Sequence, residues 1–449
     1  MSTTPAIPVI FVAEGELEGG QVTARQRAWA EANGFSGQRG KLLALPGEGD
    51  GLAGYLFGIG AAEGRPAFVA GLAAAALPPA EYRLEGEIGD PTLSAIAFRL
   101  GAYRFDRYRE AKPVPTLVLP EGADVEEIER HVVAATLARD LVNTPSSDLG
   151  PDNLQKEVER FASERGMAFR AVVGDALLAE NFPMIHAVGR ASAQPPRLLD
   201  LTWGKDSDPK VTLVGKGVTF DTGGLDIKTA AGMLMMKKDM GGAANILGLA
   251  HAIVSAKLPV RLRVLLPVVE NAISGNAFRP GDVLHSRRGL TVEIGNTDAE
   301  GRLILADALA LADEESPELI VDMATLTGAA RVALGPDLPP LYSSDDALAT
   351  EIVAAGLSAE DPFWHMPLWS AYDGQLVSKI ADMNNTGAGG YAGSVIAALF
   401  LRRFVSKAKA WLHLDILAWA PEARPGRPVG ATDQGIRAVF SVIRHRFGK

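Results

Sequence analysis

The sequence of 449 residues contains no cysteine. This absence excludes disulfides, thiolate zinc sites, iron–sulfur clusters and a cysteine nucleophile together, because each of them needs a cysteine sulfur. Any metal ion must therefore be held by carboxylates, histidine, lysine or backbone oxygens. The seven histidines are scattered singly along the chain, and the HExxH pattern of a helical zinc site is absent.

Long apolar runs are missing as well. No stretch of 18 apolar residues occurs, and a membrane-spanning helix needs about that many. The first apolar run, IPVIFVA, follows no basic residue and leads directly into a segment with three glutamates. That pattern is typical of a β-strand rather than of a secretory signal. We therefore expect a cytoplasmic protein that makes no use of a membrane.

Basic residues are fewer than acidic ones, 44 against 54, and the net charge is -10. Such a balance argues against a general nucleic-acid or anionic-membrane binder, although it leaves room for a local basic patch. With 47% hydrophobic and 22% charged residues, the composition is that of a globular protein with a large core.

Two domains and a linker follow from the pattern along the chain. Residues 1–120 mix short apolar runs with glycine-rich and proline-rich turns, which predicts a smaller N-terminal α/β domain. Residues 121–150 combine a helical pattern with a turn cluster, and we interpret them as a linking helix and turn. Residues 151–449 alternate strand-like and helical segments, which predicts a larger domain with a central mixed sheet flanked by helices.

Charged residues in the larger domain gather directly after apolar strands, among glycine, threonine and apolar side chains. The strands are predicted at 211–215 and 290–295, and a helical run lies between them. Burial of charges without partners is very costly. These residues therefore either pair with one another, as in many α/β proteins, or bind ions. They are Lys216, Asp221, Asp239, Asp298 and Glu300.

Four carboxylates gathered at one point would be neutralised by two divalent cations. Two metals about 4 Å apart can share bridging carboxylates and hold a nucleophilic water. Lys216 could ligate a metal only when neutral, a form that nearby cations favour. Lys228 and Arg302 would remain as cations for a substrate oxygen or a small anion. A phosphate-binding loop is excluded at 210–217, because residue 210 is lysine and residue 217 is glycine.

The segments NTDAEGRL (296–303) and VGKGVTFDTGG (214–224) resemble the leucyl aminopeptidase (cytosol aminopeptidase) family of dinuclear-metal exopeptidases. The resemblance covers essentially all of 135–449, whereas the first 120 residues resemble the family only weakly, through 101–109. One departure is visible at 380–394, which lacks the arginine expected after the two glycines. Further matching segments are DMGGAAN, DMATLTGA, WHMPLW, IADMNNTG and LHLDILAWA.

The resemblance implies a role for each charged residue. Asp221 and Glu300 would each reach both metal ions, Lys228 would stabilise the polarised carbonyl and the tetrahedral intermediate, and Arg302 would hold a bicarbonate that relays a proton. The full set of implied metal ligands is Lys216, Asp221, Asp239, Asp298 and Glu300. Three further residues would shape the pocket for the N-terminal side chain, namely Met236, Thr325 and Gly328.

The implied function is a metal-dependent aminopeptidase that releases leucine-like or a broad range of N-terminal residues from short peptides. The resemblance also implies two zinc or manganese ions per subunit and a homohexamer. Two alternatives stay open: a hexameric DNA-binding protein, and another dinuclear metallohydrolase such as a phosphoesterase. DNA binding would show a steep salt dependence, and a phosphoesterase would cleave aryl phosphates in preference to aminoacyl anilides.

Overall fold

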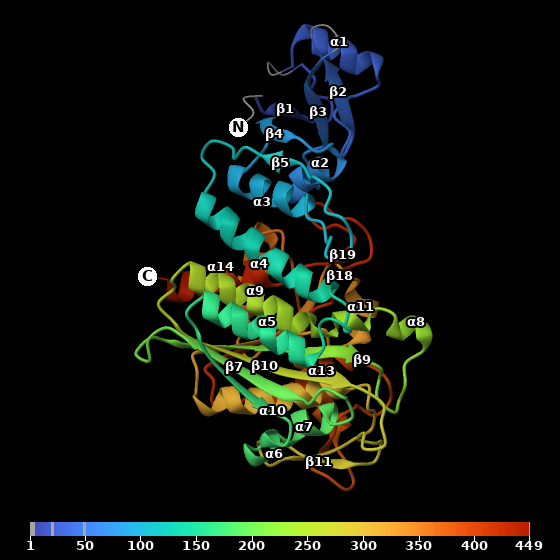
Figure 1. Ribbon diagram of the computed structural model, residues 1–449, viewed down its shortest axis with the longest axis vertical. Coiled ribbons are helices and arrows are strands. Elements are labelled where there is room, and N and C mark those ends of the chain that lie inside the picture. Colours follow the sequence, from blue (N-terminus) through green and yellow to red (C-terminus); the bar gives the residue numbers. More distant parts are fainter. Residues whose placement is uncertain (1–4, 19–21, 48–50, 449) are drawn as a thin grey trace. The chain divides into compact units, whose positions relative to one another are not determined.

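The computed structural model describes residues 5–18, 22–47 and 51–448. They form two compact units, Met1–Thr136 with Ala420–Gly430 and Leu137–Trp419 with Ala431–Lys449. The helix α4 (Val125–Asn143) runs across the division. The smaller N-terminal α/β part and the larger C-terminal part with a mixed sheet confirm the predicted fold class (Figure 1). No sequence pattern above indicated that 420–430 groups with the first unit.

The first unit contains a sheet with the strand order β2-β3-β1-β4-β5. The central strand β1 lies parallel to both β3 and β4. Its last five residues are buried, because a central parallel strand covered on its faces has no solvent side. The elements are β1 (Ile7–Ala13), α1 (Ala24–Ala32), β2 (Leu42–Pro46), β3 (Leu52–Gly60), η1 (Ala67–Val69), α2 (Ala70–Ala76), β4 (Glu81–Gly86), α3 (Pro91–Gly101) and β5 (Thr116–Leu117).

The second unit is built on a larger sheet whose path is β15-β14-β17-β13-β8-β10-β7-β6, with β9 paired to β10. Its centre, β17-β13-β8-β10, is parallel, whereas β14, β7 and β6 pair in antiparallel fashion. The strands are β6 (Ala168–Val173), β7 (Arg197–Trp203), β8 (Lys210–Gly215), β9 (Gly217–Asp221), β10 (Arg261–Asn271), β13 (Leu319–Ala324), β14 (Pro340–Ser343), β15 (Trp364–His365) and β17 (Ala410–Asp415).

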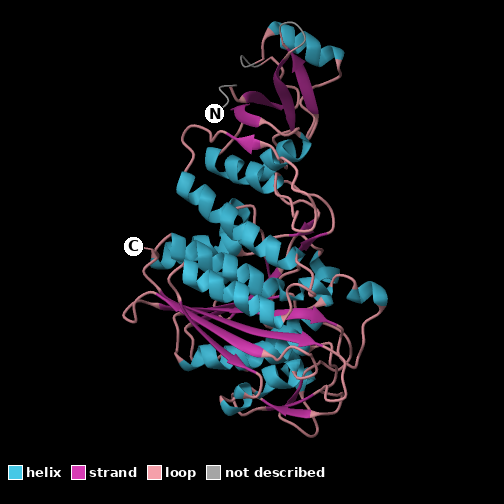
Figure 2. Ribbon diagram, viewed as in Figure 1, coloured by secondary structure: helices cyan, strands magenta, loops and turns pink. Residues whose placement is uncertain are grey.

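Helices cover both faces of this sheet (Figure 2). The helix α9 packs on one face and α10 on the other, and both contact β8 (Figure 1). The helices of the unit are α5 (Pro151–Glu164), α6 (Ala176–Ala179), α7 (Pro183–Gly189), α8 (Ala230–Met233), η2 (Met236–Met240), α9 (Gly241–Ser255), α10 (Glu300–Glu314), α11 (Gly328–Leu334), α12 (Asp346–Ser358), η3 (Ser370–Leu376), α13 (Gly393–Arg402) and α14 (Ile436–Phe447).

The order in which strands are added to the sheet reverses at β8. From β8 the chain moves to β10 on one side through α9, and β13 is added on the other side after α10. In open parallel sheets, ligands bind beyond the carboxyl ends of the strands at such a reversal of strand order. Lys216 follows β8 directly. The fold therefore indicates that the residues after β8, β9 and β13 lie where a ligand would bind.

Two local features refine the sequence prediction. The helical run expected between the two strands consists of the 3-10 helix η2, which contains Asp239, followed directly by α9. The strand expected at 290–295 is the shorter β12 (Thr291–Glu293), which belongs to a separate sheet with β11 (Val283–His285) and β16 (Met383–Asn384). Asp298 therefore approaches from outside the central sheet. A two-stranded sheet joins β18 (Trp419–Ala420) and β19 (Gly430–Ala431).

None of the helices that the structure describes combines the length and the apolar character needed to cross a membrane.

Candidate metal centre

The cluster forms where five segments of the second unit meet: the end of β8, the end of β9, the helix η2, the loop before α10 with the first residue of that helix, and the loop after β13. Lys216, the residue after β8, has its Nζ 2.6 Å from Asp239 Oδ2 and 2.9 Å from Glu300 Oε1. The same Nζ donates to the Thr325 carbonyl at 3.1 Å. Side chains from η2 and α10 are thus joined through one buried lysine.

A second lysine joins the other carboxylates. Lys228 Nζ lies 2.9 Å from Asp221 Oδ2 and forms an ion pair with Asp298. Asp221, Asp298 and Glu300 each offer an oxygen within 4.8 Å of the others. The structure therefore brings all five sequence-predicted ligands and Lys228 into one network, with Asp239 attached through Lys216.

Several glycines lie where a side chain would collide with this network or with the backbone beside it. A Cβ at Gly301 would come 2.5 Å from Lys216 Cε, and a Cβ at Gly242 would come 2.1 Å from the Met323 carbonyl oxygen. Gly223 has φ +88°, and it donates its N–H to Asp221 Oδ1 at 2.8 Å. Only glycine adopts that conformation without strain. Gly223, Gly242 and Gly301 are therefore required by the close approach of the backbone to its neighbours in this network.

Neutral residues hold the carboxylates in place, a role that the sequence did not indicate for any of them. Asn271 Nδ2 donates to Asp221 Oδ1 at 2.9 Å, and Thr325 Oγ1 donates to Asp239 Oδ1 at 2.7 Å. Asn296 Oδ1 accepts the Asp298 N–H at 2.7 Å. Asn271 and Thr325 follow apolar strands or end them, as the charged residues do, but they carry no charge that would single them out.

The pKa values of several charged groups in this network are shifted from their ordinary values. Burial, followed by the charge of Asp221, raises the pKa of Glu300 to about 8 and that of Asp298 to about 6. Burial alone would lower the pKa of Lys216, but the surrounding carboxylates outweigh burial and raise it above its ordinary value. Near neutral pH the cluster therefore holds protons that isolated carboxyl groups would have lost.

Two buried carboxylate oxygens of the cluster are compensated by ion pairs rather than by hydrogen bonds. Asp239 Oδ2 and Asp298 Oδ1 face the lysine ammonium groups at ion-pair distance but make no hydrogen bond of acceptable geometry. Carboxylate oxygens that converge in this way fit a divalent cation.

Arg302 lies in α10, two residues after Glu300, and is 8% exposed. Its Nη1 donates to the Asn385 carbonyl at 2.7 Å, whereas its Nε has no hydrogen-bond partner. Burial lowers the pKa of Arg302 to about 10, which leaves it charged at neutral pH. A buried cation with a free donor suits a small anion.

The residues predicted to shape a side-chain pocket have different surroundings. Thr325 is buried and bonded to Asp239. Met236 is half-buried at the start of η2, and Gly328 is exposed at the start of α11. A Cβ at Gly328 would meet nothing within 4 Å. Of the three, Thr325 is the one that contacts the cluster.

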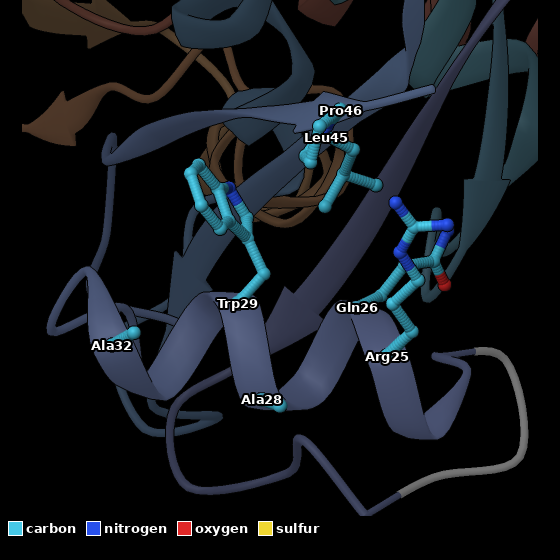
Figure 3. Close-up of a pocket in the computed structure, with 7 residues that line it drawn as sticks. All are labelled: Arg25, Gln26, Ala28, Trp29, Ala32, Leu45 and Pro46. Carbon is cyan, nitrogen blue, oxygen red and sulfur yellow. The ribbon is translucent and has the colours of Figure 1, made fainter. Parts of the chain in front are cut away.

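The first unit has an apolar pocket of about 380 Å³ between α1 and β2. Figure 3 shows Trp29 and Gln26 rising from α1 toward the strand. The residues that line it are Arg25, Gln26, Ala28, Trp29, Ala32, Leu45 and Pro46. They include neither a carboxylate nor a histidine, so the chemistry of hydrolysis has no counterpart there.

Comparison with known proteins agrees with this geometry. The family model described as "Cytosol aminopeptidase family, catalytic domain" matches residues 136–440, and "M17 aminopeptidase, N-terminal domain" matches residues 7–120. Peptidase B of Klebsiella pneumoniae (strain 342) is 41% identical over 370 residues, covering 80% of this chain and 85% of the relative.

Solved structures are similar over the full length. The cytosol aminopeptidase from Coxiella burnetii has a TM-score of 0.93 and 43% identity, covering 100% of this chain and 98% of that chain. The bottromycin maturation enzyme BotP in complex with Mn has a TM-score of 0.89 and 34% identity, covering 98% of this chain and 99% of that chain. The resemblance found in the sequence is thereby confirmed, and it extends to the N-terminal domain. This chain belongs to the cytosol aminopeptidase family and is a metal-dependent aminopeptidase.

Proposed function

We propose that the chain releases N-terminal residues from short peptides with two divalent metal ions bound at the cluster after β8 and β9. The observation that carries this proposal is the convergence of three carboxylates within 4.8 Å, two of them buried, together with buried oxygens that lack hydrogen bonds. The proposed ligands are Lys216, Asp221, Asp239, Asp298 and Glu300.

The donor set suits zinc or manganese, because carboxylate oxygens and one neutral amine nitrogen match ions of intermediate hardness. When bound, the ions would supply a Lewis acid for the scissile carbonyl and lower the pKa of a nucleophilic water. The protein's own contribution is to fix the ligands. Asn271 and the Gly223 N–H hold Asp221, and Thr325 holds Asp239.

Lys228 is the proposed oxyanion-stabilising residue. It already lies among the carboxylates, and its side chain is 16% exposed. Burial alone would lower the pKa of Lys228, but the charge of Asp221 and the close contacts with the Asp221 and Asp298 carboxylates raise it above the ordinary value. Lys228 therefore stays cationic. A fixed cation stabilises negative charge that develops on the carbonyl oxygen during attack.

Arg302 is the proposed holder of a bicarbonate that accepts and returns a proton. Support comes from its burial and from its unpartnered Nε. Asn385 fixes the other end of the guanidinium and also accepts the Gly295 N–H at 2.8 Å. The arginine is therefore tied to the loop that carries Asp298. An anion held there would supply the base that no neighbouring histidine provides.

We further propose that Met236, Thr325 and Gly328 border the space for the N-terminal side chain. The exposure of Gly328 and the half-burial of Met236 support an accessible edge, and Thr325 ties this edge to the cluster. A cytoplasmic homohexamer is proposed from the family resemblance. Such an assembly would limit substrates to short or unfolded peptides.

Metal binding is expected to release about one to two protons per subunit at pH 7, because a lysine must be neutral to ligate and metal ligands shed their protons. The raised pKa values of Lys216 and Glu300 mean that the metal-free cluster holds those protons. Calorimetric titration with Mn²⁺ in buffers of different ionisation enthalpy measures the release. A proton count of zero would show that Lys216 stays an ammonium group and is not a ligand.

Blocking the substrate's amino group is expected to abolish hydrolysis. A free α-amine has a lone pair to donate, whereas an acetylated amine has none and adds bulk beside the buried carboxylates. We would compare a leucyl anilide with its N-acetyl counterpart at equal concentration and saturating metal. Equal rates on the two substrates would contradict the assignment as an exopeptidase and favour an endopeptidase or an esterase.

A further inference from the structure

Asp415 is a fully buried carboxylate at the end of β17, outside the proposed ligand set. It lies opposite Ala324, the last residue of β13. Burial of a charge is costly unless it is paired and hydrogen-bonded. The carboxylate is compensated by Arg331, whose Nη2 lies 3.1 Å from Asp415 Oδ1, and by donors of the turn that follows β13.

The turn after β13 is bound to Asp415 at three points. Asp415 Oδ1 accepts the N–H of Leu326 at 3.1 Å and the N–H of Thr327 at 3.2 Å. Asp415 Oδ2 accepts the Thr327 hydroxyl at 2.5 Å. It also accepts the hydroxyl of Ser394 at 3.1 Å. Every acceptor position of the carboxylate is used, so the turn has one preferred orientation.

The same turn carries two contacts to the proposed metal ligands. The Thr325 carbonyl accepts from Lys216 Nζ, and the Thr325 hydroxyl donates to Asp239 Oδ1. The Thr325 carbonyl and the Leu326 N–H belong to one planar trans peptide unit and point in opposite directions. When Asp415 fixes the N–H, it therefore also fixes the direction in which the carbonyl faces Lys216.

We propose that Asp415 is a positioning residue for metal binding, which acts through the Thr325–Leu326 peptide on Lys216 and Asp239. The inference rests on the proposed ligand set. Groups that orient metal ligands typically contribute 10- to 100-fold to metal affinity, roughly, even without touching the ion. Among the residues that the structure describes, Asp415 makes no hydrogen bond or ion pair with a proposed ligand, so its effect is on ligand geometry.

The test is calorimetric titration of the full chain with Mn²⁺ after removal of metal. Asp415→Ala is expected to weaken Mn²⁺ affinity by about 10- to 100-fold, and Asp415→Asn by less, because an amide oxygen can still accept the two N–H groups. Thr327→Ala is expected to weaken affinity several-fold, roughly, whereas Thr327→Ser retains the hydroxyl and should match the wild type.

Asp361 provides a matched control. It is also a buried carboxylate, and it accepts the N–H groups of Gly435, Arg437 and Ala438 at the start of α14. Asp361→Ala should lower the melting temperature and leave Mn²⁺ affinity unchanged. An equal loss of affinity in Asp361→Ala would overturn the proposal, because the effect would then be general destabilisation.

Further variants distinguish a failure of the positioning role of Asp415 from a failure of the proposed ligand set. A folded Asp415→Ala variant with wild-type Mn²⁺ affinity would overturn the positioning role. If that variant does not fold, wild-type affinity in both Asp415→Asn and Thr327→Ala would overturn it instead. Glu300→Gln is included as a reference. Retained metal binding in Glu300→Gln would refute the ligand set itself, whereas its loss beside normal binding in Asp415→Ala would refute only the role of Asp415.

Discussion

Replacement of Glu300 by glutamine is expected to reduce peptide hydrolysis to background while the protein stays folded. Glu300 is 1% exposed and pairs with Lys216. The isosteric amide keeps the packing but removes a charge from the proposed shell, which would leave the two proposed divalent ions with an incomplete set of anionic ligands. Because burial and Asp221 raise the pKa of Glu300 to about 8, the charged form is disfavoured in the metal-free fold. The variant without metal should therefore be about as stable as the wild type.

Metal content, activity and thermal melting with and without Mn²⁺ test this expectation together. A ligand at 100 times its dissociation constant stabilises the native state by about 2.7 kcal/mol, and this increment should disappear in Glu300→Gln. Asp298→Asn should behave in the same way. Asp313→Ala is the control, because Asp313 lies near the end of the same helix and accepts the N–H groups of Lys407 and Ala408. Full metal content with normal activity in Glu300→Gln would reject the ligand assignment.

Replacement of Lys228 by alanine is expected to lower kcat by about 100- to 1,000-fold, the usual effect of losing one oxyanion donor. The metals should be retained. In the metal-free protein Lys228 occupies the carboxylates of Asp221 and Asp298, so its removal takes away a cation that competes with the ions. Affinity for Mn²⁺ should accordingly be unchanged or higher.

Steady-state kinetics at saturating metal separate this role from simple binding. A variant that raises only KM would show that Lys228 binds the ground state and not the transition state. Lys210→Ala is the matched control. Lys210 begins β8, at the opposite end of the strand from Lys216, and its Nζ donates to the Glu315 carbonyl at 3.3 Å. Its kcat should equal that of the wild type.

The sequence by itself determined the class of protein and most of the charged cluster. Without cysteine, a metal had to be held by harder ligands, and the alternation of strands and helices predicted the layered larger unit. The sequence also indicated where chemistry lies, because charges that directly follow apolar strands end up buried. The family assignment followed from two short segments, 214–224 and 296–303, and the family comparisons confirm it.

Tertiary structure alone decided how these residues meet. Lys216 and Glu300 are separated by more than 80 residues in the sequence. They meet because α10, which begins with Glu300, packs against β8, the strand that Lys216 follows. The placement of Asp239 in a 3-10 turn, and of β12 in a small separate sheet, also depended on such long-range packing.

The supporting roles of the neutral and distant residues were not indicated by the sequence. Asn271 and Thr325 have no charge to mark them, and Asp415 follows Thr325 by 90 positions, yet their hydrogen bonds fix the carboxylates and the turn. Residue types and local patterns report what a segment prefers on its own. The partners of a buried polar group are chosen by the crossing of segments far apart in the chain, because each group must find whatever donor or acceptor the folded chain places beside it.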